Sequence, residues 1–451
     1  MKNDFDLIIV GGGISGAIAG ISAARENIKT LIIDQNGFLG GMLTGAGVGP
    51  MMTFHSGSEQ VIQGITGELI DRLKKENLSP GHLFDTTGYT YTVTPFDLEG
   101  MKWALESMFL EAGGHLLYHT MLADVQLDSG MIQSLTICNK GGLSTIKGSY
   151  YIDATGDADL SAWSGVECTK GRESDGMSQP LTMKVRMYGV DMSKVRGYIH
   201  SHPEEFPRLK GDTSIIDKAE RLSIGGFVQT LKNARASGDF TFTREDILFF
   251  ETNNPGEVII NTSRITGLDS TNPFDLSKGE VEGRKQAHEL ARFFRKYISG
   301  FENAVLEFTG PSIGIRSSRQ IEGLYRITKD DILEGRKFED AVVCNGYPID
   351  VHSPTGEDTF SSHLAWGDYY TIPYRALVNK LVGNLITVGR CISGDFEAQA
   401  AFRTTPGAGA IGHAGGAASV IAVRSKKSFA ELDYKEIQDL LRKQNAFLPL
   451  D

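Results

Sequence analysis

The chain has 451 residues, a length for which two or three domains are expected rather than one hydrophobic core. Its 45 basic and 56 acidic residues give a net charge of −11, which argues against nucleic acid or an anionic membrane surface as the main partner. This balance does not exclude an anionic small molecule, because such a ligand needs only a local basic pocket.

The four cysteines are far apart and form no C-x-x-C motif, so the sequence indicates neither a zinc site nor a redox dithiol, and no metal is expected. Reduced thiols and the lack of an apolar run of about 20 residues predict a cytoplasmic protein without a membrane span. The fold begins almost at residue 1, which leaves no room for a signal peptide. The sequence leaves open whether the chain forms a homo-oligomer.

The first 34 residues predict a nucleotide-binding unit. The apolar run at residues 7–10 predicts a buried strand, and it leads into G-x-G-x-x-G at Gly11, Gly13 and Gly16. Small apolar residues follow as a helix, and a second apolar run ends at Asp34, 18 residues after Gly16. Strand, glycines, helix, strand and acid therefore occur in the order and spacing of a dinucleotide-binding βαβ unit.

Each residue type in this unit has a physical purpose. Gly11 permits a sharp turn, Gly13 lets a pyrophosphate approach the backbone, and Gly16 lets helix and strand pack closely. The helix N-terminus favours the phosphates, and Asp34 can accept hydrogen bonds from a ribose diol. The motif does not distinguish FAD from NAD, and a glycine-rich turn in an ordinary βαβ unit is the alternative.

The following elements predict the rest of a mixed α/β domain. Six glycines within residues 37–49 predict a loop packed along the cofactor. Amphipathic helices are expected at residues 64–75 and after Asp97, a plain N-cap candidate. Strands are expected at 116–118 and 123–127, an antiparallel hairpin at 131–147, and a strand at 150–153 that runs into residues 154–159.

The central block has a different character. We expect strands at 180–190, 247–251 and 257–261, and helices at 193–200, 227–236 and 280–299. Because this block carries no phosphate-binding signature, it is predicted to be a separate domain that covers the substrate.

The last third returns to apolar strands and glycine. A strand is expected at 384–390, and a helix of small residues runs from about residue 406 to 423. Gly407, Gly409 and Gly412 match G-x-G-x-x-G again, but no strand precedes them, so we expect a helix N-terminus aimed at another part of the same cofactor. A surface helix at 428–441 closes the chain.

These segments resemble a known family. The βαβ unit with Asp34, the strand end Ala154-Thr155-Gly156-Asp157 and the Gly389-Arg390 turn are similar to those of FAD-dependent oxidoreductases with a glutathione-reductase-type FAD domain. Nearly the whole chain takes part, and the likeness extends distantly to fumarate reductase flavoproteins. It implies an α/β fold with a Rossmann-like FAD-binding domain, built on a central parallel sheet with a small antiparallel meander, and an inserted α+β substrate domain.

The resemblance also implies boundaries and contacts. The FAD-binding domain would comprise residues 1–176 and 342–425, the substrate domain 177–341, and a C-terminal helix and tail 426–451. A Glu is commoner than Asp34 at its position in such families, but the chemistry is equivalent. The residues implied to contact FAD are Gly11, Gly13, Ile14, Ser15, Gly16, Asp34, Gln35, Gly40, Gly41, Met42, Val125, Thr155, Gly156, Gly389, Arg390, Ala408, Gly409, Ala410 and Ile411.

Two arginines are candidates for substrate binding. Arg403 precedes the helix expected to face the flavin and could clamp a carboxylate, or it could form a structural ion pair with Glu397 or Asp395. Arg316, three residues before Arg319, could form an anion clamp with it, or an inter-domain salt bridge.

Acid–base candidates are His55, the first choice, and His352, the second, each with a packed imidazole as the alternative. Cys391 could be a buried filler or carry a covalent flavin link. Tyr89 and Tyr91 could line the pocket or only pack.

The expected function is therefore hydride transfer between flavin N5 and a small metabolite bearing a carboxylate or several hydroxyls, with an unidentified electron acceptor. The alternatives are a flavin-dependent hydroxylase, an NAD-using relative, and a non-catalytic dinucleotide-binding protein.

Overall fold

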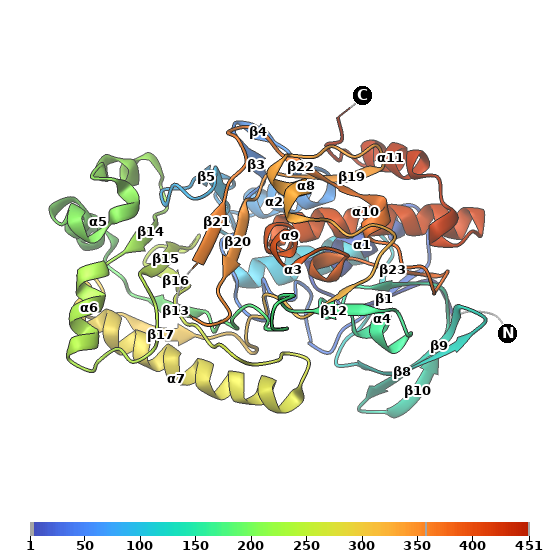
Figure 1. Cartoon of the computed structure of the whole chain (residues 1–451), viewed down its shortest axis with the longest axis horizontal. Helices are drawn as coiled ribbons and strands as arrows, with labels where there is room; N and C mark the ends of the chain where they lie inside the picture. Colours follow the sequence, from blue (N-terminus) through green and yellow to red (C-terminus); the bar gives the residue numbers. More distant parts are fainter. Residues whose placement is uncertain (1–3, 357–358, 450–451) are drawn as a thin grey trace.

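The computed structural model describes residues 4–356 and 359–449. Its first layer is a five-stranded parallel sheet near the N-terminus (Figure 1). The strand order is β23-β11-β1-β2-β7, with β1 at Phe5–Val10, β2 at Thr30–Ile33, β7 at His115–Leu117, β11 at Gly148–Asp153 and β23 at Leu385–Thr387. The last strand thus joins the first ones across more than 200 residues of intervening chain, so the sheet is discontinuous in sequence.

Both faces of this sheet are covered. Leu7 and Ile9 point to a core shared with the helices, and Ile8 and Val10 point to a second core under the antiparallel meander. This explains why residues 7–10 are apolar without alternation. The helices are α1 (Ile14–Arg25), α2 (Gly64–Lys75), α3 (Leu98–Glu111), α10 (Thr405–Ser425) and α11 (Tyr434–Lys443), and the meander is β8 (Met121–Asp128), β9 (Met131–Asn139) and β10 (Gly142–Ile146).

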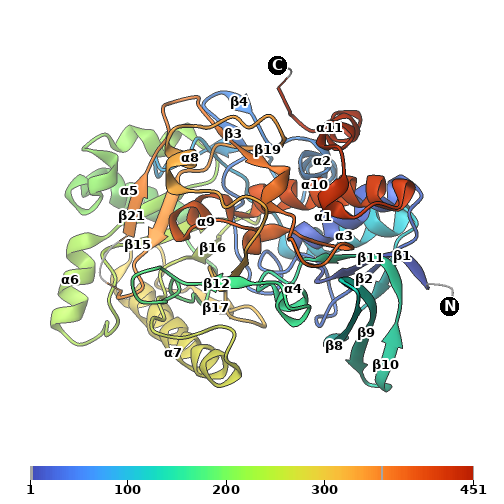
Figure 2. The ribbon, with the colours of Figure 1, turned by 45° about the vertical axis from the view of Figure 1, so that its right-hand side comes forward.

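The central block forms its own antiparallel sheet, at the opposite end of the molecule from the meander in both views (Figures 1 and 2). Its order is β14-β15-β16-β13-β17, from β13 (Val185–Tyr188), β14 (Ser223–Gly226), β15 (Ile247–Glu251), β16 (Glu257–Ile260) and β17 (Val305–Phe308). Helices α5 (Met192–Ser201), α6 (Val228–Ala236) and α7 (Pro273–Tyr297) pack with it around a separate core. The architecture is therefore α/β with an added antiparallel unit, as expected, whereas the predicted domain boundaries stay a prediction.

Short elements connect the two parts. The described residues include five two-stranded sheets, which pair β12 with β18, β19 with β22, β20 with β21, β3 with β4, and β5 with β6. Their bounds are β12 Cys168–Lys170, β18 Arg319–Ile321, β19 Ala341–Asn345, β22 Tyr370–Pro373, β20 Ile349–His352, β21 Thr359–Ser362, β3 His55–Ser56, β4 Glu59–Gln60, β5 Leu83–Phe84 and β6 Thr92–Val93. The short helices are α4 (Asp159–Trp163), α8 (Lys329–Leu333) and α9 (Phe396–Phe402).

Two helix predictions are confirmed, one by its bounds and one by its cap. Helix α2 has the expected bounds, and Asp97 caps α3 by accepting a hydrogen bond from the Gly100 amide at 2.7 Å.

Among the described helices, none has both the length and the apolar surface that crossing a bilayer requires.

Other predicted bounds were wrong. Helix α7 begins at Pro273 rather than 280, because Asn272 caps it and proline is favoured in a first helical turn. Helix α11 begins only at Tyr434, after a 3₁₀ turn at Phe429–Glu431. The strand expected at 180–190 is regular only over Val185–Tyr188, with isolated bridges before it.

The crossing of α1 and α10 has no room for side chains. A Cβ added at Gly412 would lie 2.1 Å from the Ser15 carbonyl oxygen, and one at Gly416 would lie 2.4 Å from that of Ala19. Of the glycines in the second G-x-G-x-x-G, Gly412 thus serves this backbone contact, and Gly416, one turn later, serves it as well.

Replacing Gly412 by Ala should force the two helices apart and lower the free energy of unfolding by about 1–3 kcal/mol. Gly197→Ala is the matched control, because that glycine lies within α5 and an added Cβ would meet nothing within 4 Å. Urea unfolding should show a loss for Gly412→Ala and no loss for Gly197→Ala. Equal stability of the two variants would contradict the packing role.

Candidate functional site

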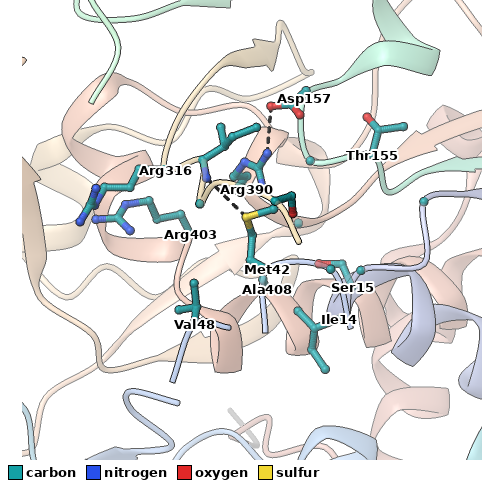
Figure 3. Close-up of a pocket in the computed structure, with 18 of the residues that line it drawn as sticks. Ile14, Ser15, Met42, Val48, Thr155, Asp157, Arg316, Arg390, Arg403 and Ala408 are labelled. Atoms are coloured by element: carbon teal, nitrogen blue, oxygen red, sulfur yellow. Dashed lines mark hydrogen bonds and ion pairs between the residues drawn. The ribbon is translucent and has the colours of Figure 1, made fainter. Parts of the chain in front are cut away.

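One cavity of about 670 Å³ extends from the end of β2 to the central sheet. This volume is within the usual range for cofactor and small-molecule sites. Its walls come from both parts of the chain, and Figure 3 shows ten of the lining residues by name. The cavity has three stretches: the end at Asp34, the middle at the two glycine turns, and the end at the central sheet.

At the first end, Asp34 lies at the tip of β2 and is 7 % exposed. Its Oδ2 accepts a hydrogen bond from the Gly12 amide at 2.6 Å, and Oδ1 accepts one from the Asn36 amide at 2.6 Å. Burial raises the pKa of this carboxyl, and the two amides oppose the shift. Gln35, Thr120 and Leu122 complete the wall.

Val125 does not lie on this wall. It is buried in the core between the meander and the parallel sheet, three residues beyond Leu122. The alternation of β8 turns the side chain of Val125 into that core. Residues 120–122 line the cavity at this end, where we expected Val125 to lie.

In the middle, the β1–α1 turn leaves open backbone. Gly11 has a φ of +100°, and a Cβ there would lie 2.4 Å from the Ala154 carbonyl oxygen. A Cβ on Gly16 would lie 1.9 Å from the Gly11 oxygen, whereas one on Gly13 would meet only Gly41 Cα, at 3.9 Å. Gly13 caps α1 without a side chain and faces the cavity. The three glycines thus have the geometry of a pyrophosphate-binding turn.

The loop after β2 comes back to this turn. Gly40 pairs with Gly13 as an isolated parallel bridge, and Gly41 and Met42 line the cavity. Gly41 has a φ of +55°, and a Cβ there would lie 2.7 Å from Gly13 Cα. Met42 Sδ accepts a hydrogen bond from the Ile315 amide at 3.4 Å, which ties the loop to the central block (Figure 3).

Two further turns close the middle. Thr155 and Gly156 follow β11, where the buried Asp153 accepts hydrogen bonds from the Thr155 amide and hydroxyl at 3.1 and 2.8 Å. Arg390, after Gly389, forms an ion pair with Asp157 at 2.9 Å (Figure 3). Gly156 has a φ of +80°, and a Cβ there would lie 2.7 Å from the Arg390 guanidinium, so glycine is required for this approach.

Helix α10 starts at the same cavity. Thr404, Thr405 and Ala408 line it, and the buried Thr404 hydroxyl has no hydrogen-bond partner within the described part of the chain. Gly409, Ala410 and Ile411, which we also expected at the cofactor, lie on sides of the helix turned away from the cavity lining. Gly409 faces Thr66, for example.

At the central sheet, three basic side chains line the cavity: Lys184, Arg316 and Arg403. Arg316 donates a hydrogen bond to the Pro180 carbonyl at 2.6 Å and another to Thr182 Oγ1. Arg403 donates to the Asp350 carbonyl at 3.2 Å, and its Nη2 lies 3.4 Å from Asp350 Oδ2. The two guanidinium groups point into the same region (Figure 3).

Asp350 is the carboxylate among these cations. Its Oδ2 lies 3.3 Å from both the Tyr347 hydroxyl and His352 Nε2. Burial opposes its ionisation, but the facing His352, Arg403 and Arg316 outweigh burial and hold the pKa of Asp350 below its usual range. Burial, and then the charge of Arg316, lower the pKa of His352 to about 3, so this imidazole is neutral at pH 7.

Several expectations differ from this geometry. His55 does not line the cavity, because its Nδ1 bonds to Thr92 Oγ1 at 3.0 Å and its ring packs on His82. Arg319 does not join Arg316 in a clamp, since it forms an ion pair with Asp159 at 2.7 Å. Arg403 pairs with Asp350 rather than with Glu397 or Asp395.

Cys391, Tyr89 and Tyr91 occupy packing positions. Cys391 is fully buried and its thiol faces the Val388 carbonyl, as a filler would. Tyr89 packs on Tyr347 with ring centroids 6.1 Å apart, and Tyr91 packs on Trp366. Within the described residues, no group of His, Cys, Asp and Glu could hold a metal ion.

The sequence interpretation missed Lys184, Asp350 and Tyr347. A signal for Lys184 was present: from residue 181 to 187, polar Thr182, Lys184 and Arg186 alternate with apolar residues. In an extended chain such alternation places one set on a single face, and a face of two cations and a hydroxyl within an apolar block is unusual for a buried strand.

Asp34→Ala should leave the buried Gly12 amide without its acceptor and weaken dinucleotide binding about 10-fold or more. The measurement is the amount of adenine dinucleotide released on denaturing the purified protein. Asp128→Ala, on the exposed end of β8, is the control and should retain full occupancy. Full occupancy of Asp34→Ala would show that this carboxylate is dispensable.

The chain is similar in sequence or in fold to several known proteins. The thiamine thiazole synthase of Methanococcus aeolicus is 29 % identical over 234 residues, 50 % of this chain and 78 % of that protein. The dihydrolipoamide dehydrogenase of Chaetomium thermophilum is 24 % identical over 164 residues, 36 % of this chain but only 30 % of that protein. A geranylgeranyl bacteriochlorophyll reductase-like structure from Thermoplasma acidophilum aligns with a TM-score of 0.45 and 13 % identity, over 97 % of this chain and 82 % of that one.

The family comparison gives the assignment. The model of the family described as FAD dependent oxidoreductase matches residues 6–441, which include both glycine turns and the central block. The cavity fits the cofactor. Glycines without room for a Cβ leave the backbone open in the middle of the cavity, and glycines of the same kind in α10 let the start of that helix reach the far side. The chain therefore belongs to the FAD-dependent oxidoreductase family, and FAD is its cofactor.

Proposed function

We propose that this enzyme transfers hydride between FAD and a small metabolite that carries a carboxylate or a comparable anionic group. The observation that supports the proposal is the excess of positive charge where the cavity reaches the central sheet. The guanidinium groups of Arg316 and Arg403 line this region, and Asp350 is the one acid beside them among the described residues of this wall. Buried cations without counter-charges are costly, so an anionic ligand would complete the site. An uncharged polyol would not.

The residues that would hold FAD divide by position. Asp34 would contact the adenosine ribose, the turns at Gly13 and Gly41 the pyrophosphate, and Arg390 with the start of α10 the flavin end. When bound, FAD supplies the acceptance or donation of a hydride at N5 of its ring. The N-terminus of α10 would favour negative charge on its side of the cavity, because the helix dipole is positive there.

The chain's own residues would bind and orient the substrate. Arg403 is anchored by the Asp350 carbonyl, and Arg316 by the Pro180 carbonyl. Each guanidinium has five donors in a rigid fork, so these anchors leave donors for a carboxylate. Gln179 steadies Arg403 through a 3.5 Å contact and accepts a hydrogen bond from the His352 amide at 3.2 Å.

The test is anaerobic reduction of the holoenzyme, and the measured quantity is the loss of flavin absorbance. Hydroxy acids and amino acids should bleach the flavin, and the matched neutral alcohols and amines should not. Bleaching by polyols alone would contradict the anionic substrate. Reduction only by a nicotinamide, with substrate turnover that requires oxygen, would favour a flavin-dependent hydroxylase.

Arg403→Ala should retain the flavin but lower the efficiency of reduction by an active hydroxy acid or amino acid about 10- to 100-fold, the effect of one lost charge-assisted hydrogen bond. Arg403→Lys should recover part of the loss. Arg295→Ala, an exposed arginine on α7, is the control and should be unchanged. Unchanged reduction in Arg403→Ala would remove this residue from the site.

A further inference from the structure

Lys184 differs from the two arginines beside it. Its side chain is 8 % exposed and lines the cavity. Among residues 4–356 and 359–449, its ammonium group has no hydrogen-bond acceptor and no ion-pair partner. The backbone explains its direction: Leu181, Met183 and Val185 point into the core of the central block, so Lys184 points the opposite way, as Thr182 does.

The groups around Lys184 are mostly cationic. Burial lowers the pKa of its amine well below the usual value, and the neighbouring charges of Arg316, Arg244 and Arg403 lower it further. Asp350 acts in the opposite direction. The neutral His352 and the hydroxyl of Thr182 complete the polar groups of this region. Because arginine keeps its proton in proteins, the lysine is the member of the cluster that can release one.

The other candidate bases are engaged. His352 Nε2 faces Asp350 Oδ2 at 3.3 Å, and its Nδ1 lies 3.4 Å from Thr359 Oγ1. The Tyr347 hydroxyl also faces Asp350, and burial raises its pKa well above the usual value. Asp350 itself is paired with Arg403. Within the part of the chain that the structure describes, the amine of Lys184 makes no such contact, and it borders the cavity.

We propose that Lys184 Nζ is the proton acceptor in the oxidation of a carboxylate that carries a hydroxyl or amino group on the carbon that is oxidised. This inference rests on the proposed function. The C–H bond of that carbon breaks and its electron pair leaves with the hydride to FAD, which is reduced. The O–H or N–H bond of the group attached to that carbon also breaks. Its electron pair forms the C=O or C=N bond, and its proton goes to the Lys184 amine.

The charges of the site favour this sequence. Without substrate, the surrounding arginines disfavour an ammonium at Lys184. A bound carboxylate neutralises part of the charge of these arginines. The ammonium that forms at Lys184 during the reaction is therefore more stable with substrate bound than it would be in the empty site. Substrate binding thus prepares the amine to take up the proton.

Two variants separate proton transfer from charge. Lys184→Met removes the amine, and Lys184→Arg keeps a positive charge that cannot be lost. Both should lower the rate constant of anaerobic flavin reduction by at least about 100-fold, and both should lose the rise of that rate constant with pH. Lys278→Met, an exposed lysine on α7, is the control. Near-normal reduction and pH dependence in Lys184→Arg would overturn the inference, because charge alone would then suffice.

A second measurement does not need turnover. Acetic anhydride modifies only neutral amines, and mass spectrometry of the holoenzyme gives the pH midpoint of acetylation for each lysine. The midpoint for Lys184 should lie well below that for Lys278, and should rise when malonate is present. Equal midpoints for the two lysines would overturn the inference whatever the activity.

Malonate also separates this inference from the proposed function. It should shift the flavin spectrum of wild type and of Lys184→Arg alike, because Arg316 and Arg403 remain. If malonate leaves the wild-type spectrum unchanged and no carboxylate reduces the flavin, the proposed function fails. If malonate binds and carboxylates reduce the flavin, but Lys184 acetylates like Lys278, only the role of Lys184 fails.

Discussion

The site depends on the contact between the backbones of α1 and α10. The starts of both helices line one cavity. Gly412 and Gly416 on α10 let the two backbones come into contact at Ser15 and Ala19. As a result, two positive helix ends point toward one elongated cavity from segments about 390 residues apart in the chain.

Local sequence was sufficient where a single physical rule decides the structure. The strand–glycine–helix–strand unit, the Asp97 cap and the bounds of α2 follow from periodicity, capping and glycine geometry. The start of α7 could have been found as well, since Asn272-Pro273 is a cap followed by a favoured first residue. In each case the determining atoms lie within a few residues of one another.

The substrate end could not be found in this way. Asp350, Arg403 and Lys184 belong to β20, to the link between α9 and α10, and to the approach to β13, and no local pattern relates their positions. The first-choice histidine, His55, lies outside the cavity lining for a similar reason. Its position close to the cofactor loop in sequence does not reveal its contacts with Thr92 and His82. The partner of Arg403 was likewise a residue distant in sequence instead of the acids beside it.

The alternation along residues 181–185 has an evolutionary consequence. Leu181, Met183 and Val185 lie in the core of the central block, and Thr182 and Lys184 face the cavity. Substitutions at the two outward positions can change what the pocket accepts without touching either hydrophobic core or the dinucleotide turns. A short stretch of extended chain is therefore a place where descendants of one ancestral enzyme can diverge toward new metabolites while stability and redox machinery are inherited intact.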